Sequence, residues 1–378
     1  GKENALARAK ALDKGAIKGL LHGLPIGVKD LFDTHDLPTS YGSSIYTDNY
    51  PSTDAVSVAL IRQSGGIILG KTVTTEFASF KSGKTTNPHH SQHTPGGSSS
   101  GSAAAVADFM IPLATGSQTA GSIIRPASFC GVVGYKPSLG KISTAGVKSL
   151  APSLDTLGCF ARSVDDAALS VATMTGDFEL ANVPTAPKSV RIATCLTPDA
   201  DQASSDTILA IEHAALLAED HFKNPVKNIR LSKVFTKLAE TQSRIMWAES
   251  AKSFSFEQAM YPEQLSQQIK GLLKIGNAIT YEQYSNDLIV AEQARQAIDQ
   301  LLTQSCDILI APSAIGEAPS GITQTGDPIF CRIWTLLGLP CINLPLSRGS
   351  NGLPVGIQLV GARGKDRLLL SVAHALMS

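Results

Sequence analysis

Apolar and polar positions along the chain follow two periodicities, one typical of strands and one of helices. Residues 67–69 form a short apolar run typical of a buried strand, and residues 54–63 before it carry apolar side chains at helical spacing. The same criteria predict further apolar, strand-like runs at 25–28, 111–115, 131–135, 190–195, 307–311, 341–344 and 355–360. They predict further helices at 3–12, 74–80, 103–109, 165–174, 206–221 and 368–377.

A long helical region interrupts this alternation at about residues 234–304. Mixed polar and apolar residues have helical spacing there, with breaks near Pro262 and Gly276. Strands recur on both sides of the region. The pattern therefore predicts an α/β fold with one large sheet and an inserted helical segment.

One glycine motif imitates a nucleotide-binding loop. Residues 65–72 (GGIILGKT) satisfy the pattern G-x-x-x-x-G-K-[ST]. A phosphate-binding loop needs a strand before the glycines and a helix after them. Here the helix comes first and the apolar triplet is itself the best strand, so we expect a helix, a turn at Gly65 and a strand.

A second glycine motif imitates the nucleophile elbow of an α/β-hydrolase. Residues 97–101 (GSSSG) fit G-x-S-x-G, but the elbow must follow a strand. Residues 87–96 before it are polar and proline-containing, so they form a loop. Its three histidines, at 89, 90 and 93, have no carboxylate beside them, and we expect no metal site.

A third small-residue segment is a better candidate for chemistry. Residues 116–126 (GSQTAGSIIRP) follow a predicted strand and precede a predicted helix. Successive backbone N–H groups in such a turn can converge on one point, which is how an oxyanion hole forms. Ser122 is then either a nucleophile or only a capping residue of the next helix. The segment alone does not decide between these two roles.

Composition narrows the class of protein. The 378 residues have zero net charge, 43% apolar and 6% aromatic residues, and 32 glycines. This excludes disorder and disfavours binding of nucleic acid, which requires excess positive charge. The longest apolar runs are too short to cross a bilayer. Six scattered cysteines without C-x-x-C spacing indicate free thiols in a reducing, cytoplasmic compartment. Because the chain lacks an initiator Met, we expect its N-terminal helices to be incomplete.

Several of these stretches together resemble the amidase signature family of serine hydrolases. The matching stretches are 27–30 (GVKD), 95–107, 116–126, 129–131, 134–137, 156–158 and 353–358. The segments SIIRP (122–126), TGDP (325–328) and RIWTL (332–336) are most similar to malonamidase-like bacterial amidases. The resemblance implies one domain over residues 1–378, with a single large mixed central sheet covered by helices on both faces.

The family's Ser–cis-Ser–Lys triad corresponds to three residues of this chain. The resemblance implies Ser122 as the nucleophile, Ser98 as the bridging serine after a cis bond, and Lys29 as the base. Because a free lysine has a pKa of about 10.4, Lys29 must be buried to be neutral near pH 7. Asp30 would oppose this if it lay close. The backbone amides of residues 119–122 (Thr119, Ala120, Gly121 and Ser122) would form the oxyanion hole.

The chain departs from the common family pattern at three positions. Ala120 stands where many members have glycine, and Gln118 where many have aspartate. Arg125 follows Ser122 by three residues rather than two, as in malonamidase-like members, where this arginine binds a substrate carboxylate. The alternative is that Arg125 only braces the site. We take Arg125, Gly97 and Gln118 as candidate substrate-binding residues.

The predicted function is hydrolysis of a small amide to an acid and ammonia or an amine through an acyl-enzyme. Arg125 suggests that the amide bears a carboxylate. The alternative is the amidase subunit of a tRNA-dependent amidotransferase, which the arginine spacing disfavours. We expect no cofactor, a small-molecule amide as the partner, and no direct contact with nucleic acid or membrane. A homodimer is left open.

Overall fold

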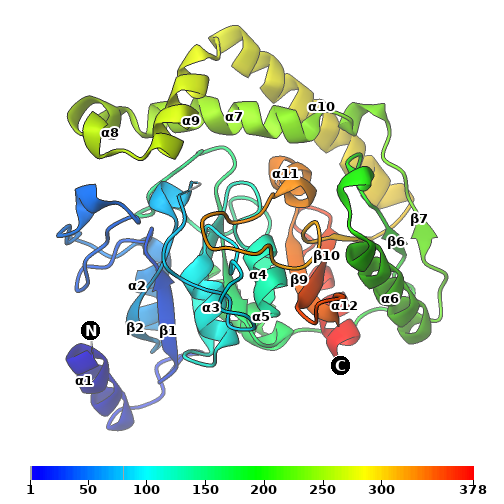
Figure 1. The fold of residues 1–378 in the computed structure, drawn as a ribbon. Helices are drawn as coiled ribbons and strands as arrows, with labels where there is room; N and C mark the ends of the chain where they lie inside the picture. Colours follow the sequence, from blue (N-terminus) through cyan, green and yellow to red (C-terminus); the bar gives the residue numbers. More distant parts are fainter. Residues whose placement is uncertain (1, 80) are drawn as a thin grey trace.

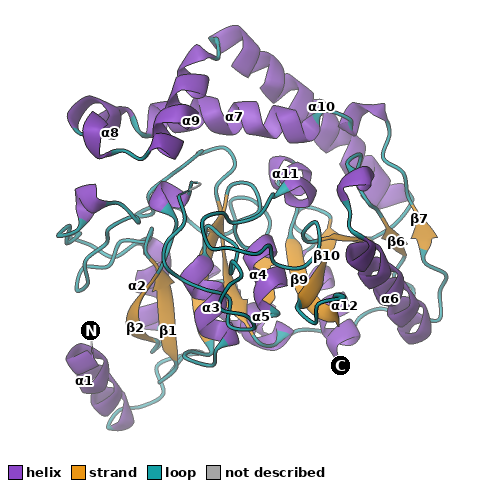
Figure 2. Cartoon of the chain, in the orientation of Figure 1, coloured by secondary structure: helices purple, strands orange, loops and turns teal. Residues whose placement is uncertain are grey.

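The computed structural model describes residues 2–79 and 81–378, and its ten strands form one sheet (Figure 2). The strands are β1 (Pro25–Lys29), β2 (Ile67–Thr72), β3 (Leu113–Gln118), β4 (Val133–Lys136), β5 (Thr156–Ala161), β6 (Ile192–Thr194), β7 (Lys227–Asn228), β8 (Ile308–Pro312), β9 (Cys341–Arg348) and β10 (Pro354–Gly361). Their order across the sheet is β2-β1-β3-β5-β4-β9-β10-β8-β6-β7.

The sheet is mixed, as the resemblance implied. Strand β1 runs parallel to both β2 and β3, and β6 runs parallel to β7 and β8. The pairs between β3 and β8 in the centre are all antiparallel. Strand β5 was not predicted from the pattern, because Gly158 interrupts it. A Cβ on Gly158 would lie 2.0 Å from the Tyr135 carbonyl oxygen, so only glycine allows the two strands to pair there.

Helices cover both faces of the sheet, which confirms the expected fold class. They are α1 (Lys2–Asp13), α2 (Val56–Gln63), α3 (Ser100–Ala107), α4 (Ile124–Cys130), α5 (Val164–Thr175), α6 (Ser205–Phe222), α7 (Leu238–Ser253), α8 (Ser255–Met260), α9 (Gln267–Ala278), α10 (Tyr281–Gln304), α11 (Ile329–Leu336) and α12 (Asp366–Met377). Helices α2, α5, α12 and α6 contact one another in a row on one face, and α3 packs with α4 on the other. Phe160 of β5 accordingly belongs to the core beside α3 and α4, whereas its neighbour Cys159 belongs to the larger core.

Four helices of the predicted insertion lie along one side of the molecule (Figure 1). Helix α7 contacts α9, α10 and α11, and α11 lies between this helical layer and the sheet (Figure 1). We refer to α7–α10 as the helical layer. Helix α11 was not predicted, and the helix expected at 74–80 is only the short turn Glu76–Ala78, with Phe80 outside the described residues.

The two misleading motifs have the conformations that their context predicts. Gly65 follows α2 with φ of 86° and β2 begins at Ile67, so the segment is helix, turn and strand rather than a phosphate loop. In the second motif, residues 97–99 are a loop that leads into α3 at Ser100. No strand of the described residues precedes that loop directly, which excludes the hydrolase elbow.

Candidate active site

The parallel strands β1 and β3 bring two predicted site segments together at one edge of the sheet. Lys29 is the last residue of β1, and Gln118 ends β3 just before the turn that carries Ser122. Neighbouring parallel strands end at the same edge, where α/β proteins commonly place their ligands. The backbone N–H of Lys29 also donates to Thr115 Oγ1 at 2.9 Å, which ties the two strands together.

The side-chain amine of Lys29 is buried among serine hydroxyls. Its Nζ lies 2.7 Å from Ser98 Oγ, 2.8 Å from Ser99 Oγ and 2.8 Å from Ser117 Oγ. Lys29 has no exposed surface, and no described carboxylate forms an ion pair with it. The structure therefore brings two of the three predicted triad residues, Lys29 and Ser98, into direct contact.

Burial lowers the pKa of Lys29 well below the ordinary value of a lysine. Desolvation disfavours the ammonium ion, and the negative charge of Asp155 opposes the effect only in part. Asp30, the expected opponent, instead lies 3.2 Å from the Nζ of Lys71. A neutral amine with a lone pair next to Ser98 can accept a proton from that hydroxyl.

The loop before α3 carries Ser98. The peptide bond between Gly97 and Ser98 is cis, as the resemblance implied. Ser98 is buried, and its carbonyl oxygen accepts a hydrogen bond from the N–H of Thr75. The carbonyl of Gly97 accepts from Arg125 Nη2 at 2.7 Å, so Gly97 contacts a predicted substrate-binding residue rather than the pocket wall.

The turn between β3 and α4 places Ser122 at a pocket. Ser122 is 8% exposed and lines the pocket together with Thr119 and Ala120. Among the described residues, no acceptor is found for the amides of Ala120, Gly121 and Ser122. Donors left unused beside a serine can stabilise an oxyanion. Ala120 does not have a positive φ, so its replacement of the common glycine causes no strain.

Gln118 braces this turn from inside. Its Oε1 accepts from the N–H of Ile123 at 2.8 Å and of Ile124 at 3.0 Å, which are orphan donors at the start of α4. Its Nε2 donates to Thr335 Oγ1 at 3.0 Å. The side chain is buried and is not part of the pocket wall, so the structure does not bring it together with the other candidate substrate-binding residues.

Two arginines reach the same pocket. Arg125 is 4% exposed and donates through Nη2 to Gly97 O and Thr325 Oγ1, while its Nε and Nη1 have no partner among the described residues. Burial lowers the pKa of Arg125 to about 10, and the charge of Arg332 adds to this effect. No described carboxylate lies within ion-pair distance of either arginine. The pocket therefore has positive charge without a protein counter-ion.

The pocket beside Ser122 encloses about 420 Å³ and has a mixed lining. Its walls are Ala78, Ser79, Thr119, Ala120, Ser122, Arg125, Leu150, Met246, Leu272, Thr325, Pro328 and Arg332. Met246 and Leu272 come from the helical layer, and none of these side chains is aromatic. The volume and lining suit a small molecule with one apolar side and one anionic end.

A sequence model of the amidase family, described as "Amidase", matches residues 2–370. The chain belongs to this family. Enzymes of the family act on carbon–nitrogen bonds of amides, so this amidase is an enzyme of that class. The sequence resemblance is thereby confirmed at the level of the family and of the fold.

Curated relatives and solved structures cover nearly the whole amidase chain. One of the subunits of the glutamyl-tRNA(Gln) amidotransferase of Natranaerobius thermophilus is 31% identical, over 99% of this chain and 86% of the relative. The peptide amidase of Stenotrophomonas maltophilia is 28% identical with a TM-score of 0.84, over 99% and 86% of the two chains. An inhibitor-bound chain from a "vestigial protein complex", described in connection with an s-triazine catabolic enzyme, is 27% identical with a TM-score of 0.91, over 99% and 89%.

These relatives correct the expected partners. We expected only a small-molecule amide, no direct nucleic acid and at most a homodimer. Relatives from several bacteria carry the name of a component of a tRNA amidotransferase, so the family evidence indicates protein partners and tRNA-linked activity instead. The sequence could not reveal this, because a zero net charge describes a single polypeptide and not the complex that it joins.

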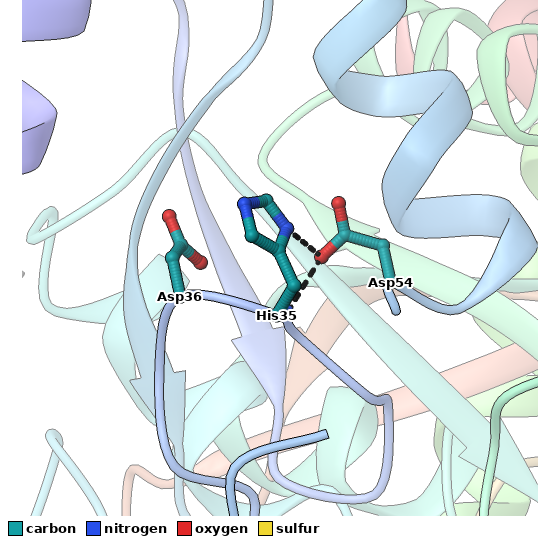
Figure 3. Close-up of side chains that lie close together, drawn as sticks. All are labelled: His35, Asp36 and Asp54. Atoms are coloured by element: carbon teal, nitrogen blue, oxygen red, sulfur yellow. Dashed lines mark hydrogen bonds and ion pairs between the residues drawn. The ribbon is translucent and has the colours of Figure 1, made fainter. Parts of the chain in front are cut away.

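A cluster of possible metal ligands occurs away from the pocket. His35, Asp36 and Asp54 lie close together in Figure 3, where His35 contacts Asp54. Arg62 contacts both carboxylates, through Nη2 with Asp36 at 2.5 Å and through Nε with Asp54 at 3.0 Å. A guanidinium already neutralises this cluster, so the residues are accounted for as an ion-pair network.

Two other expectations concern the whole chain. All six cysteines are free and buried, in line with the expected thiols. None of the helices in the described part of the chain has the length and apolar character needed to cross a bilayer.

Sequence reasoning missed four residues of the site. Ser117 contacts Lys29, and Asp155 holds the hydroxyl of Thr119 at 2.5 Å. Gln242 of α7 donates to the carbonyl of Thr119 at 2.8 Å and accepts from Arg332. These residues come from a loop and from the helical layer, where no motif marked them. Arg332 lay within a matched stretch, but only its position in the pocket gives it a role.

Proposed function

We propose that this amidase cleaves a small carboxylate-bearing amide through an acyl-enzyme on Ser122, as the amidase-type subunit of an amidotransferase complex. One observation carries the chemical part of the proposal. A buried lysine with a lowered pKa contacts Ser98 at 2.7 Å, beside a pocket that Ser122 lines. This is the combination that an activated serine nucleophile needs.

The proposed steps use only groups of this chain. Ser122 Oγ attacks the amide carbon while Ser98 takes the hydroxyl proton and passes its own proton to neutral Lys29. The amides of the 119–122 turn stabilise the negative oxygen. Lys29 returns the proton through Ser98 to the leaving nitrogen, which departs as ammonia or an amine. Water, or an acceptor in the complex, then completes the reaction.

The charge of the pocket supports the substrate class. Arg125 and Arg332 both line the pocket, and neither has a carboxylate partner among the described residues. A buried guanidinium without a counter-ion is costly unless a ligand supplies one. An amide with a carboxylate at its far end meets both requirements, because the planar guanidinium matches carboxylate geometry.

The names of the relatives support the complex, and a rate comparison tests it. Ammonia release from glutamine would be measured for this chain alone and after addition of the other amidotransferase subunits with charged tRNA. We expect the rate to rise at least tenfold in the complex. An equal rate in both conditions would contradict the subunit role while leaving the chemistry at Ser122 intact.

Replacing Ser122 tests the chemistry directly. Ser122→Ala should lower hydrolysis of every amide by roughly a thousandfold or more, because no acyl-enzyme can form. Ser91→Ala, in the exposed part of the same loop as Ser98, is the control and should keep full activity. Intact-protein mass spectrometry during turnover should detect an acyl adduct only on the parent chain and the control. An adduct on Ser122→Ala would refute the assignment.

A further inference from the structure

Asp155, in the loop just before β5, connects two walls of the site. Its Oδ1 accepts from Thr119 Oγ1 at 2.5 Å. Its Oδ2 accepts from Ser149 Oγ at 2.7 Å and from the N–H groups of Leu150 at 2.9 Å and Ala151 at 3.1 Å. Thr119 belongs to the turn with the unused amides, and Leu150 lines the same pocket. The carboxylate therefore fastens the turn to the opposite wall.

We propose that Asp155 is a positioning residue of the reaction, which fixes Thr119 so that the turn amides face the oxyanion and whose charge acts on the Lys29 amine. The inference rests on the proposed function, because it assumes that Ser122 and Lys29 perform the chemistry. Four donors around one side chain satisfy the acceptor capacity of a carboxylate and not that of a carboxylic acid. Asp155 is accordingly ionised.

The electrostatic part of the role follows from what surrounds Lys29. Asp155 and Ser117 line a common cavity, and the Ser117 hydroxyl contacts Lys29 Nζ at 2.8 Å. The negative charge of Asp155 raises the pKa of Lys29 against the larger lowering effect of burial. The charge thus keeps the lysine from losing its proton too readily.

Other charged groups near these residues are paired elsewhere. Asp30, which follows Lys29, is paired with Lys71. Lys148 lines the cavity of Asp155 and forms an ion pair with Glu257. No described cation forms an ion pair with Asp155 itself. Its charge is therefore left to act on the amine of Lys29.

Two substitutions separate the two parts of the role. Asp155→Asn removes the charge but can keep the fastening, because the amide oxygen can replace Oδ2 and the amide N–H can donate to the Thr119 hydroxyl. Thr119→Val removes the fastening hydroxyl and leaves the charge of Asp155 in place. Thermal melting of both variants reports whether each is folded.

The rate at which a fluorophosphonate labels Ser122 provides a readout that needs no known substrate. In this reaction Ser122 Oγ forms a bond to phosphorus, fluoride leaves, and the hydroxyl proton passes through Ser98 to Lys29. Labelling located at Ser122 by mass spectrometry would be followed from pH 5 to pH 10. Its acidic limb reports the pKa of the essential base.

We expect Asp155→Asn to move the acidic limb about one unit to lower pH, the low end of the effect of an opposite charge. We expect Thr119→Val to slow labelling about tenfold with the limb in place. A limb that stays or moves up in Asp155→Asn, or full-rate labelling of Thr119→Val, would overturn the inference. Absence of labelling in the parent chain would instead overturn the proposed function.

Discussion

At the scale of single residues, the site depends on how Lys29 is buried. A lysine with no exposed surface among three serine hydroxyls cannot keep its ordinary pKa, because the ammonium ion has lost its water. The lost hydration destabilises the fold and at the same time creates a base. Function and stability therefore oppose each other at this residue.

Replacing Lys29 by methionine should reveal this opposition in the pH dependence of stability. Folded Lys29 binds its proton less tightly than the unfolded chain, so unfolding takes up a proton between the lowered folded pKa and about 10.4. The free energy of unfolding of the parent chain should thus rise with pH relative to Lys29→Met, by up to about 1.4 kcal/mol per unit. Urea denaturation from pH 7 to pH 10 measures the difference.

Two other lysines with lowered pKa, Lys71 and Lys136, are present in both proteins, so their effects cancel in the comparison. The same Lys29→Met variant should lose nearly all amide hydrolysis while remaining folded. Parallel stability curves would show that Lys29 keeps an ordinary pKa. Retained hydrolysis would show that it is not the base.

The two pocket arginines predict how the enzyme selects its substrate. Arg125→Ala and Arg332→Ala should each raise KM for a carboxylate-bearing amide such as malonamate by roughly tenfold to a hundredfold, the range expected for a lost hydrogen bond to a charged group. KM for a neutral amide of the same length should change little. Steady-state ammonia release measures both. An equal loss for both amides would mean that the arginines only brace the site.

At the scale of elements, the helical layer takes part in the site through α7. Gln242 is fully buried, and its amide lies between the Thr119 carbonyl at 2.8 Å and Arg332 Nη1 at 2.9 Å. One side chain of α7 thus connects the oxyanion turn to α11. A helix that is remote in sequence from both catalytic serines helps to hold the turn in place.

Replacing this glutamine tests the connection. Gln242→Leu leaves the Thr119 carbonyl and an Arg332 N–H without their partner, which should lower the free energy of unfolding by about 1–3 kcal/mol. Hydrolysis should slow as well, since the turn loses a restraint. Gln293→Leu, at an exposed position of α10 in the same layer, should alter neither property. Urea denaturation and ammonia release together measure the effect, and an unchanged rate in Gln242→Leu would separate the layer from catalysis.

At the scale of the whole molecule, one buried carboxylate holds the last helix to the middle of the sheet. Asp366 begins α12 and accepts from Tyr135 Oη at 2.7 Å and from Ser138 Oγ at 2.6 Å. Tyr135 lies on β4, among the antiparallel strands of the sheet centre. The interaction joins residues 231 positions apart, so it closes the fold between its two ends.

Asp366→Ala should therefore lower the free energy of unfolding by about 3 kcal/mol, because the Tyr135 hydroxyl is left buried without an acceptor. Asp165→Ala provides the control, since it removes an exposed contact with His374 of the same helix and should cost less than about 0.5 kcal/mol. Urea denaturation compares the two. Equal losses would mean that the contact at Asp366 has no special weight.

How far the sequence predicts each element depends on where its information lies. Strand β2 and helix α2 follow from local periodicity, so their pattern was enough. Strand β5 has Gly158 at its centre and becomes a strand only through the backbone of β4. Helix α11 packs between the sheet and α7, and its short apolar run gave no helical signal on its own.

The sequence by itself determined the α/β class, the exclusion of two false motifs and the turn that carries Ser122, because each depends on neighbouring residues. Through a family resemblance it also indicated Lys29 and Ser98. Only the tertiary structure decided that the amine of Lys29 is buried, that Arg332 joins Arg125, and that Asp155 and Gln242 hold the turn. Burial, charge and hydrogen bonding act across space, and a linear pattern does not record which distant residues meet.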